Sequence, residues 1–306
     1  ITVTTLMPSL RVIRTAAALL CAAASLAVPV AASGQAIERD VFVSVLNRSD
    51  DPVLNLGPAD FIVREDGRAR EVLRVRRATD PIDLAILIDT SQAASVQITD
   101  LRQSLEAMVT RMQAQAHIAL IGYGERPTVL ADYTTDAAQL KAGIGRVFGI
   151  SGSGAYTLEA ITDTLKGLKK REVGRQAIVV LWVGGREFSN LHYDQVLEPL
   201  AAQGPALHVI AVSPGTPADA GTNEGRNRET VFDRGPARSG GRRQNILSPM
   251  ALTDACTHLA AELLNQYRIT YARPQTLIPP EKIVVTGRTA EWTLRATPVH
   301  DKDPAK

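Results

Sequence analysis

Residues 82–91 read IDLAILIDTS, a nearly all-apolar run from Ile82 to Ile88 that is followed by an acid and two hydroxyls. A strand that is apolar on both faces is typical of a parallel sheet covered by helices on each side. Two later stretches, 177–183 and 207–212, share this pattern, and segments with helical periodicity stand between them. This alternation predicts an α/β fold: a doubly wound, mostly parallel sheet with helices on both faces.

Segments with strand patterns flank this region on both sides. Asp66-Gly67 is a tight-hairpin signal between 61–63 and 72–75, and strand patterns return at 267–271 and beyond. Because each block is too small to hold a core alone, we expect the two chain ends to pair into one small accessory β sheet. The predicted organisation is a signal peptide at 1–36, an N-terminal β segment at 37–80, an α/β domain at 81–273, and a C-terminal β segment with a tail at 274–306.

One internal segment interrupts the α/β pattern. Residues 215–246 are rich in glycine and arginine and contain few apolar residues. This composition predicts a long mobile loop within the α/β domain. Its arginines allow contact with a polyanion as an alternative, but a solvated loop is the expectation.

The first 36 residues have the features of an export signal. Arg11 and Arg14 precede an apolar run from Ala16 to Ala27, and small residues end at Ala32 or Ala36, where cleavage is expected. An uncleaved anchor helix is the alternative. The rest of the chain has no comparable apolar run, so we expect an exported protein, periplasmic or extracellular, without stable membrane insertion after cleavage.

Composition excludes several classes of function. The chain has 306 residues, with 34 Lys and Arg against 32 Asp and Glu, and this balance argues against nucleic-acid binding. It has 2 cysteines, which is too few for a disulfide scaffold or a cysteine-rich zinc site. Cys256 falls on the apolar stripe of a predicted helix, so we expect it in the core.

The Asp89-Thr90-Ser91 sequence directly after a buried strand resembles the DxSxS loop of von Willebrand factor A (VWFA) domains. The segments Ala59 to Gly67 and Glu262 to Tyr267 flank it in the order found in the bacterial exported VWFA-related family. The resemblance covers roughly residues 41–298. It implies a VWFA-like α/β fold and a non-enzymatic protein-interaction module whose partner the sequence does not identify.

In that family five side chains hold a divalent cation at the metal-ion-dependent adhesion site. Asp89 and Ser91 match the first two positions, whereas the remaining three are occupied by Ala93, Ala155 and Val183. A shift in register offers Thr157 in place of Ala155. Hard cations require several oxygen ligands, so the resemblance implies a degenerate site that holds Mg²⁺ weakly at best, and no cofactor is expected.

An enzyme on the same scaffold is the alternative, for example a hydrolase that uses Asp89 and Ser91. The sequence lacks a phosphate-binding loop, a paired cysteine motif and a zinc-binding HExxH motif. The groups that surround Ser91 in the folded chain discriminate the two hypotheses. A base within hydrogen-bond reach favours the enzyme, and a rim formed by Ala93, Ala155 and Val183 favours the binding module.

Overall fold

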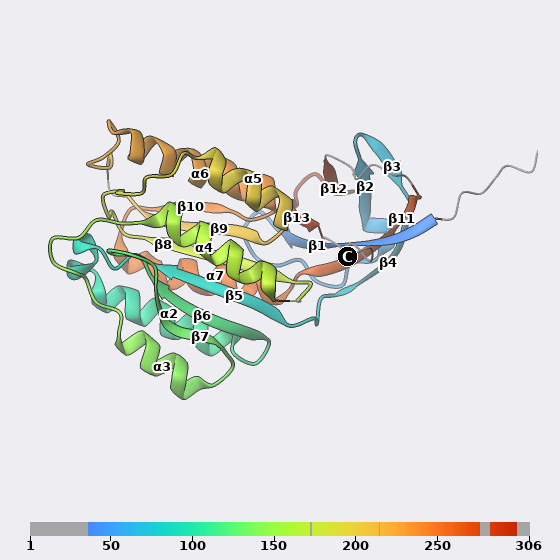
Figure 1. Cartoon of the computed structure of the whole chain (residues 1–306). Coiled ribbons are helices and arrows are strands. Elements are labelled where there is room, and N and C mark those ends of the chain that lie inside the picture. The colour runs from blue at the N-terminus through green and yellow to red at the C-terminus, as the bar shows by residue number, and fades with distance from the viewer. Residues whose placement is uncertain (1–35, 172, 214, 276–281, 299–306) are drawn as a thin grey trace, which may run out of the picture.

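The computed structural model describes residues 36–171, 173–213, 215–275 and 282–298. A six-stranded sheet runs through the α/β region in the order β10-β9-β8-β5-β6-β7 (Figure 1). Neighbouring strands are parallel except for β7, which pairs antiparallel with β6 at one edge. The strands are β5 (Ile82–Ile88), β6 (Ala116–Gly122), β7 (Thr128–Thr134), β8 (Gln176–Trp182), β9 (Ala206–Val212) and β10 (Arg243–Ile246).

Helices cover both faces of this sheet, which confirms the predicted fold class. One face packs against α2 (Ile98–Met112), α3 (Ala137–Gly145) and α7 (Leu252–Leu264). The other packs against α4 (Thr157–Lys170), α5 (Asp194–Gln203) and α6 (Asn223–Ser239). Short 3₁₀ helices are η1 (Pro58–Asp60), η2 (Gln92–Val96) and η3 (Pro249–Ala251).

Alternation along the central strands divides the apolar side chains between two cores. In β8, Val179 and Leu181 face the α2 and α7 side, whereas Val180 and Trp182 face the α4 and α6 side. Every residue of β5 is buried, as its sequence predicts. Cys256 is also fully buried, and burial raises the pKa of its thiol to about 12, so the predicted core role of this residue is confirmed.

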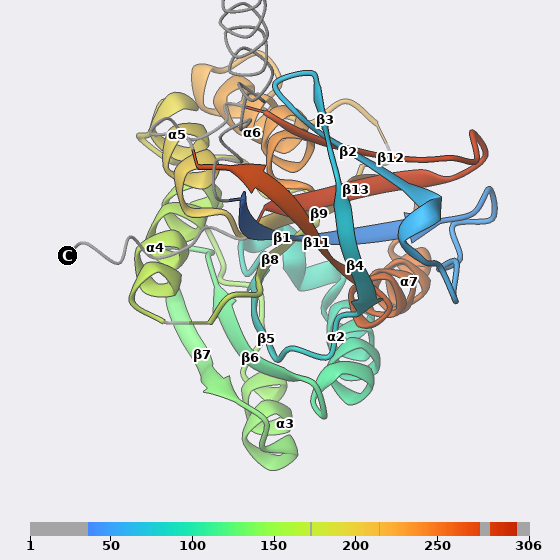
Figure 2. The ribbon, with the colours of Figure 1, turned by 90° about the vertical axis from the view of Figure 1, so that its right-hand side faces the viewer.

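The two chain ends do pair, but they form two antiparallel sheets instead of one. Figure 2 shows both sheets, with strand orders β13-β1-β11-β4 and β12-β2-β3. Their strands are β1 (Ala36–Leu46), β2 (Phe61–Glu65), β3 (Arg68–Arg70), β4 (Val72–Arg77), β11 (Tyr267–Pro274), β12 (Ile283–Gly287) and β13 (Thr293–Pro298). Strand β11 pairs with β1, although the sequence-based boundary assigned its residues 267–273 to the α/β domain.

The predicted hairpin turn at Asp66-Gly67 is present. Both residues have positive φ, 46° and 80°, as a two-residue turn of this kind requires. The partner of β2 in the hairpin is the short strand β3, not residues 72–75. These residues belong to β4, which pairs with β11 in the larger accessory sheet.

The prediction of a mobile loop at 215–246 is wrong. The segment forms α6 and β10, and α6 is anchored by Val231 and Phe232 in the core. The rest of its buried face consists of residue types that an apolar pattern does not count, namely Gly225, Arg228, Gly235, Pro236 and Ser239. Small residues there let the helix approach the sheet closely, since a Cβ on Gly235 would lie 2.7 Å from the side chain of Leu207.

Polar side chains join the accessory sheets to the α/β region. The guanidinium of Arg175 donates to the carbonyl oxygen of Ala78 and to the side chain of Gln266, and Gln266 in turn donates to Ser44 of β1. These groups are buried and hydrogen bonded, so they fix the accessory sheets at the amino ends of the parallel strands (Figure 1).

The export signal predicted at 1–36 lies outside the described residues, apart from Ala36. No helix in the described ranges has the length and apolarity needed to cross a bilayer.

Candidate functional site

Asp89 lies directly after β5, at the carboxyl edge of the central sheet, and its side chain is fully buried. Its carboxylate accepts hydrogen bonds from three backbone N–H groups: Ser91 at 3.0 Å, Val183 at 3.1 Å and Gly185 at 3.0 Å. Two of these donors belong to the loop that follows β8. The carboxylate is therefore hydrogen bonded within the protein, by groups that carry no net charge.

Ser91 is enclosed beside this carboxylate. Its side chain is 1% exposed, and its Oγ has no hydrogen-bond partner within the described part of the chain. The backbone of Gly185 covers both residues, because a Cβ built there would lie 2.5 Å from Ser91 Oγ and 2.7 Å from Asp89 Oδ2. A residue with a side chain does not fit at position 185 unless the loop moves.

The other positions named for a metal site bring no side-chain oxygen. Ala93 is half-buried, Ala155 and Val183 are buried, and all three are aliphatic. The alternative residue, Thr157, is the first residue of α4, and its buried Oγ1 has no partner among the described residues. These donors do not fit a divalent cation, which takes six or more oxygens. No group of three or more His, Cys, Asp or Glu side chains suited to a metal occurs within the described ranges.

The loop that follows β8, residues 183–190, is held from several sides. Its Gly185 carbonyl accepts from the indole Nε1 of Trp182 at 2.9 Å and from the guanidinium of Arg228 at 3.4 Å. Its Glu187 N–H donates to Asp219 at 2.7 Å. The Arg228 guanidinium also lies 4.4 Å from the centroid of the Trp182 ring. Helix α6 therefore fixes the geometry of the loop that faces Asp89.

Within that loop, Glu187 and Ser189 cap helix α4. Glu187 Oε1 accepts from the backbone N–H of Thr157 at 3.0 Å, and Ser189 Oγ accepts from that of Leu158 at 3.1 Å. The helix has no cap from its own N-terminal residue, so these contacts satisfy otherwise unpaired N–H groups. Burial raises the pKa of Glu187 to about 7, against the opposing effect of its hydrogen bonds and of Arg228.

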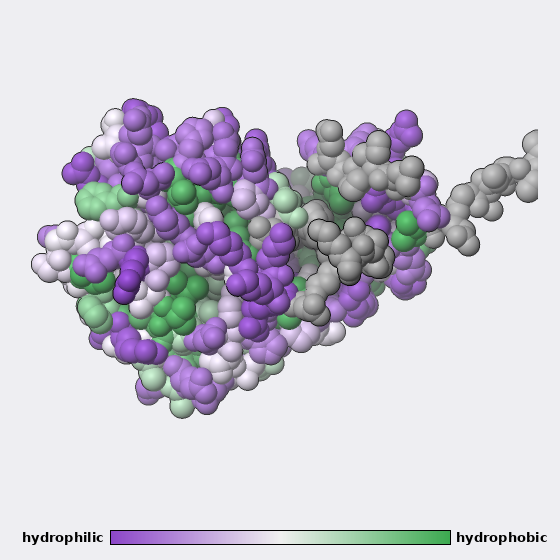
Figure 3. Space-filling view, in the orientation of Figure 1, coloured by the Kyte–Doolittle hydropathy of each residue, from purple (hydrophilic) through white to green (hydrophobic). Residues whose placement is uncertain are grey.

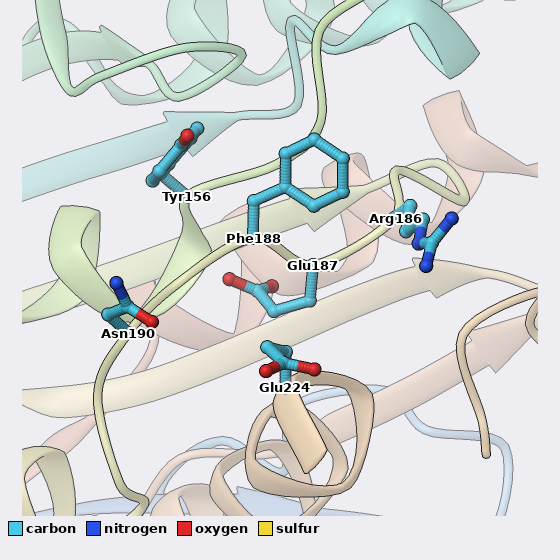
Figure 4. A pocket seen from close by; sticks show the side chains of 6 residues that line it. All are labelled: Tyr156, Arg186, Glu187, Phe188, Asn190 and Glu224. Atoms are coloured by element: carbon cyan, nitrogen blue, oxygen red, sulfur yellow. The ribbon is translucent and has the colours of Figure 1, made fainter. Parts of the chain in front are cut away.

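A pocket opens at the surface between this loop and the first turn of α6. We call it the Phe188 pocket; its volume is ≈ 300 Å³. Figure 4 shows the side chains that line it, which are Tyr156, Arg186, Glu187, Phe188, Asn190 and Glu224. Two acids, two aromatic rings, an amide and a guanidinium thus line a pocket formed in part by the loop that covers Asp89.

Exposed apolar side chains lie at the same edge of the sheet. Val96 ends η2 and is 87% exposed, and Leu247 directly follows β10 and is 77% exposed. Phe188 is partly exposed, and Phe148 precedes Gly149, whose backbone packs against Ser95. In Figure 3 the visible surface of the α/β region is mixed, with green apolar areas scattered among hydrophilic ones. The carboxyl edge therefore offers apolar contacts next to a polar pocket.

Sequence reasoning identified Asp89 and Ser91 but missed Glu187, Asp219 and Arg228. Asp219 and Arg228 fall in the segment interpreted as a loop, so nothing drew attention to them. Glu187 follows the apolar stretch 177–183, which the sequence predicted as a buried strand. An acid four residues after the strand end was the available signal, and its role became apparent only from its contact with α4.

The sequence profile of the von Willebrand factor type A domain matches residues 83–230. This part of the chain is a von Willebrand factor type A domain. The match includes Asp89 and Ser91, the pocket residues and α6 as far as Thr230. A comparison with curated proteins gave no match.

Several solved structures are similar to this VWA-containing chain. A von Willebrand factor type A protein from Catenulispora acidiphila is 9% identical, with a TM-score of 0.48 over 87% of this chain and 74% of that one. The PilB minor pilin from Streptococcus sanguinis is 11% identical, with a TM-score of 0.48 over 61% and 62%. The vWF domain of the type V pili tip protein Mfa5 from Porphyromonas gingivalis is 22% identical, with a TM-score of 0.32 over 34% and 38%. The alignment thus spans less than two thirds of the PilB and Mfa5 chains.

Proposed function

We propose that the chain is an exported, non-enzymatic protein-interaction module that holds its partner at the carboxyl edge of the VWA sheet without a bound divalent cation. The observation that carries this proposal is the hydrogen bonding and burial of the Asp89 carboxylate. Its carboxylate is satisfied by three backbone N–H groups and covered by Gly185. The edge around it offers exposed apolar side chains, of the kind found at protein interfaces.

The set of oxygen donors around Asp89 supports the proposed independence from a cation. A metal at this position has to displace the amide donors of Val183 and Gly185 and bind with two protein side chains, Asp89 and Ser91. Ala93, Ala155 and Val183 contribute no further oxygen ligand. The geometry therefore supports a retained fold with a degenerate metal site, in which Mg²⁺ is held weakly at best.

The enzyme alternative, with Ser91 as a nucleophile, is not supported. A nucleophile requires a base within hydrogen-bond reach and access to its substrate. Ser91 Oγ has no hydrogen-bond partner within the described ranges, and its side chain is 1% exposed. The enclosing groups are the Asp89 carboxylate and the backbone at Gly185.

Export to the periplasm or the cell exterior is supported by the amino-terminal pattern. Arg11 and Arg14 before an apolar run, with small residues up to Ala36, are the features of a cleaved signal. Expression of the full chain in a Gram-negative host tests this part of the proposal. We expect the mature chain outside the cytoplasm without its first segment, as measured by mass spectrometry. An intact amino terminus retained in the membrane contradicts export.

A photo-crosslinking experiment tests the interaction surface. A photoreactive amino acid at Val96 or Leu247 samples the carboxyl edge, and the same amino acid at Leu54, which is 49% exposed beyond β1, serves as the matched control. We expect a crosslinked partner in envelope or culture fluid from Val96 and Leu247, unchanged by a chelator. Crosslinks from Leu54 alone overturn the assignment of the surface, and loss of the Val96 crosslink on chelation overturns cation independence.

A further inference from the structure

The Phe188 pocket contains a buried carboxylate oxygen without a partner. Glu187 is 2% exposed, and its Oε1 caps α4. Its Oε2 has no hydrogen-bond partner among the residues that the structure describes. In Figure 4 the carboxylate points into the space between Asn190 and Glu224. Burying a hydrogen-bond acceptor without a donor costs free energy. A ligand that places a donor in this space therefore gains a hydrogen bond to Glu187 Oε2.

A second acid faces the same space from another element. Glu224 lies in the first turn of α6, is half-buried and forms no ion pair with another described residue. Figure 4 shows the carboxylates of Glu224 and Glu187 on neighbouring sides of the pocket. Two carboxylates that share a small space attract a positively charged group.

Aromatic rings form the wall of the pocket above these acids. The rings of Tyr156 and Phe188 meet edge to face, with centroids 6.3 Å apart and an interplanar angle of 89°. Aromatic faces attract ammonium and guanidinium groups. The one cation in the lining, Arg186, lies on the opposite side from Asn190 (Figure 4), and its guanidinium carbon lies 5.8 Å from the centroid of the Phe188 ring.

An organic cation fits this lining better than a metal ion. A divalent cation needs six or more oxygens at close range, and the aromatic rings supply no such ligand. An alkyl chain that ends in a positive charge uses the whole lining, because its stem packs on the rings and its head reaches the carboxylates. The volume of ≈ 300 Å³ is at the lower end of ligand pockets, which suits a single side chain.

The geometry points to the Phe188 pocket as the receptor for one basic side chain, a lysine or an arginine, of the protein partner. This inference rests on the proposed function, since it gives the chemistry of the partner that the carboxyl edge holds. The basic head donates to the unpaired Glu187 Oε2 and to Glu224, and its stem lies against Phe188.

The test uses a small probe and the mature chain. The probe is Nα-acetyl-lysine methylamide, titrated against the chain while the backbone amide signals of Phe188 and Asn190 are followed by NMR. Nα-acetyl-norleucine methylamide is the control that lacks the charge. We expect saturable shifts with millimolar affinity for the lysine probe and at least about tenfold weaker binding of the norleucine probe.

Glu224→Gln removes one charge and keeps the shape, so we expect it to weaken the lysine probe about tenfold. Glu198→Gln on α5, an exposed position, makes the same change of charge outside the pocket and should leave binding unchanged. Glu187→Gln retains an acceptor for the Thr157 N–H, so it tests the second carboxylate while the cap of α4 is kept. Equal binding of both probes, or equal effects of Glu224→Gln and Glu198→Gln, overturns the inference. Displacement of the lysine probe by millimolar Mg²⁺ assigns the pocket to a metal and overturns it as well.

The crosslinking experiment separates this inference from the proposed function. If Val96 crosslinks to a partner and the lysine probe does not bind, the pocket is wrongly assigned and the interaction surface stands. If the probe binds and crosslinks arise from Leu54 alone, the interaction surface is wrongly assigned and the pocket stands.

Discussion

Arg228 and Asp219 form a bidentate ion pair in which both side chains are buried. Two nitrogens of the guanidinium lie 2.5 and 3.0 Å from the two oxygens of the carboxylate. Asp219 also accepts from the backbone N–H of Glu187, and Arg228 donates to the carbonyl oxygen of Gly185. The pair therefore connects α6 to the loop that covers Asp89, and each partner is needed to keep the other buried.

The first prediction concerns this pair. Arg228→Ala leaves the Asp219 carboxylate buried without its cation, so we expect a loss of about 3–5 kcal/mol in the free energy of unfolding. Urea denaturation followed by circular dichroism measures it. Arg226→Ala on the same helix is the control: Arg226 is exposed, and its removal should cost less than about 1 kcal/mol. Similar losses for both variants contradict a structural role of the buried pair.

The second prediction concerns the loop over Asp89. Gly185→Ala places a Cβ 2.5 Å from Ser91 Oγ, so the loop has to shift and we expect a loss of about 1–3 kcal/mol in stability. Gly167→Ala is the matched control, because Gly167 lies exposed within α4 and a Cβ there meets no atom within 4 Å. This control should gain about 0.5–1 kcal/mol from helix propensity. The thermal midpoints of the two variants, measured side by side, should therefore move in opposite directions.

The third prediction concerns pH. His208 is fully buried in β9, and burial lowers its pKa from 6.5 to about 4, with Glu262 opposing this effect and Arg295 and Arg242 adding to it. Between these values the unfolded chain binds one more proton than the folded chain, so stability falls as pH falls from about 6.5 to about 4. The difference between the two pKa values corresponds to about 3 kcal/mol.

Unfolding measured over this pH range with His208→Leu checks the assignment. The variant should lose that part of the pH dependence, whereas His258→Leu, at an exposed position on α7, should keep it. A pH profile that is identical for wild type and His208→Leu shows that another group is responsible.

The fourth prediction concerns Mg²⁺. The unaltered chain should show no specific rise in melting temperature with millimolar Mg²⁺. The triple change Ala93→Ser, Ala155→Thr and Val183→Asp should produce such a rise. It corresponds to a gain of about 2.7 kcal/mol in the free energy of unfolding at a Mg²⁺ concentration a hundredfold above Kd. Without metal this variant should be less stable, because a second carboxylate lies near Asp89.

A double variant without the added acid, Ala93→Ser with Ala155→Thr, is the control and should not respond to Mg²⁺. Calorimetry on the unaltered chain gives the opposite test. Micromolar Mg²⁺ binding that is abolished by Asp89→Ala places a working metal site at this edge and overturns the degenerate assignment.

The sequence predicted those helices and strands whose buried residues are apolar and regularly spaced. The strand at Ile82–Ile88 and the helix that contains Cys256 are examples, because aliphatic side chains account for most of their contacts. The Asp66-Gly67 turn was predictable for a different reason, since its backbone conformation restricts the residue type. Helix α6 was not predictable in this way. Its buried face includes a charged residue, Arg228, that is stabilised by Asp219 and by the Trp182 ring, partners that meet only in the folded chain.

In the candidate site, too, some residues were predictable from one segment of sequence, whereas others are recognised only in the folded chain. A motif identified Asp89 and Ser91, because the spacing of an acid and a hydroxyl after a strand is visible in one segment. The Phe188 pocket combines residues of three segments, and neither Glu187 nor Glu224 stands in a recognisable pattern. Their significance depends on one oxygen that lacks a partner, which is a property of the assembled structure.

The accessory sheets determine where the protein can be labelled or immobilised without covering its candidate binding face. The described chain begins in β1 and ends in β13, neighbouring strands in which Val41 pairs with Pro298. Both strands lie beyond the amino ends of the parallel strands (Figure 1), whereas Val96 and the Phe188 pocket belong to segments that follow the carboxyl ends of β5 and β8. A dye or an immobilisation linker attached at Ala36 or Pro298, the first and last residues that these strands contain, is therefore attached away from the carboxyl edge. The protein can be mounted on a sensor through β1 or β13 with its candidate binding face left accessible.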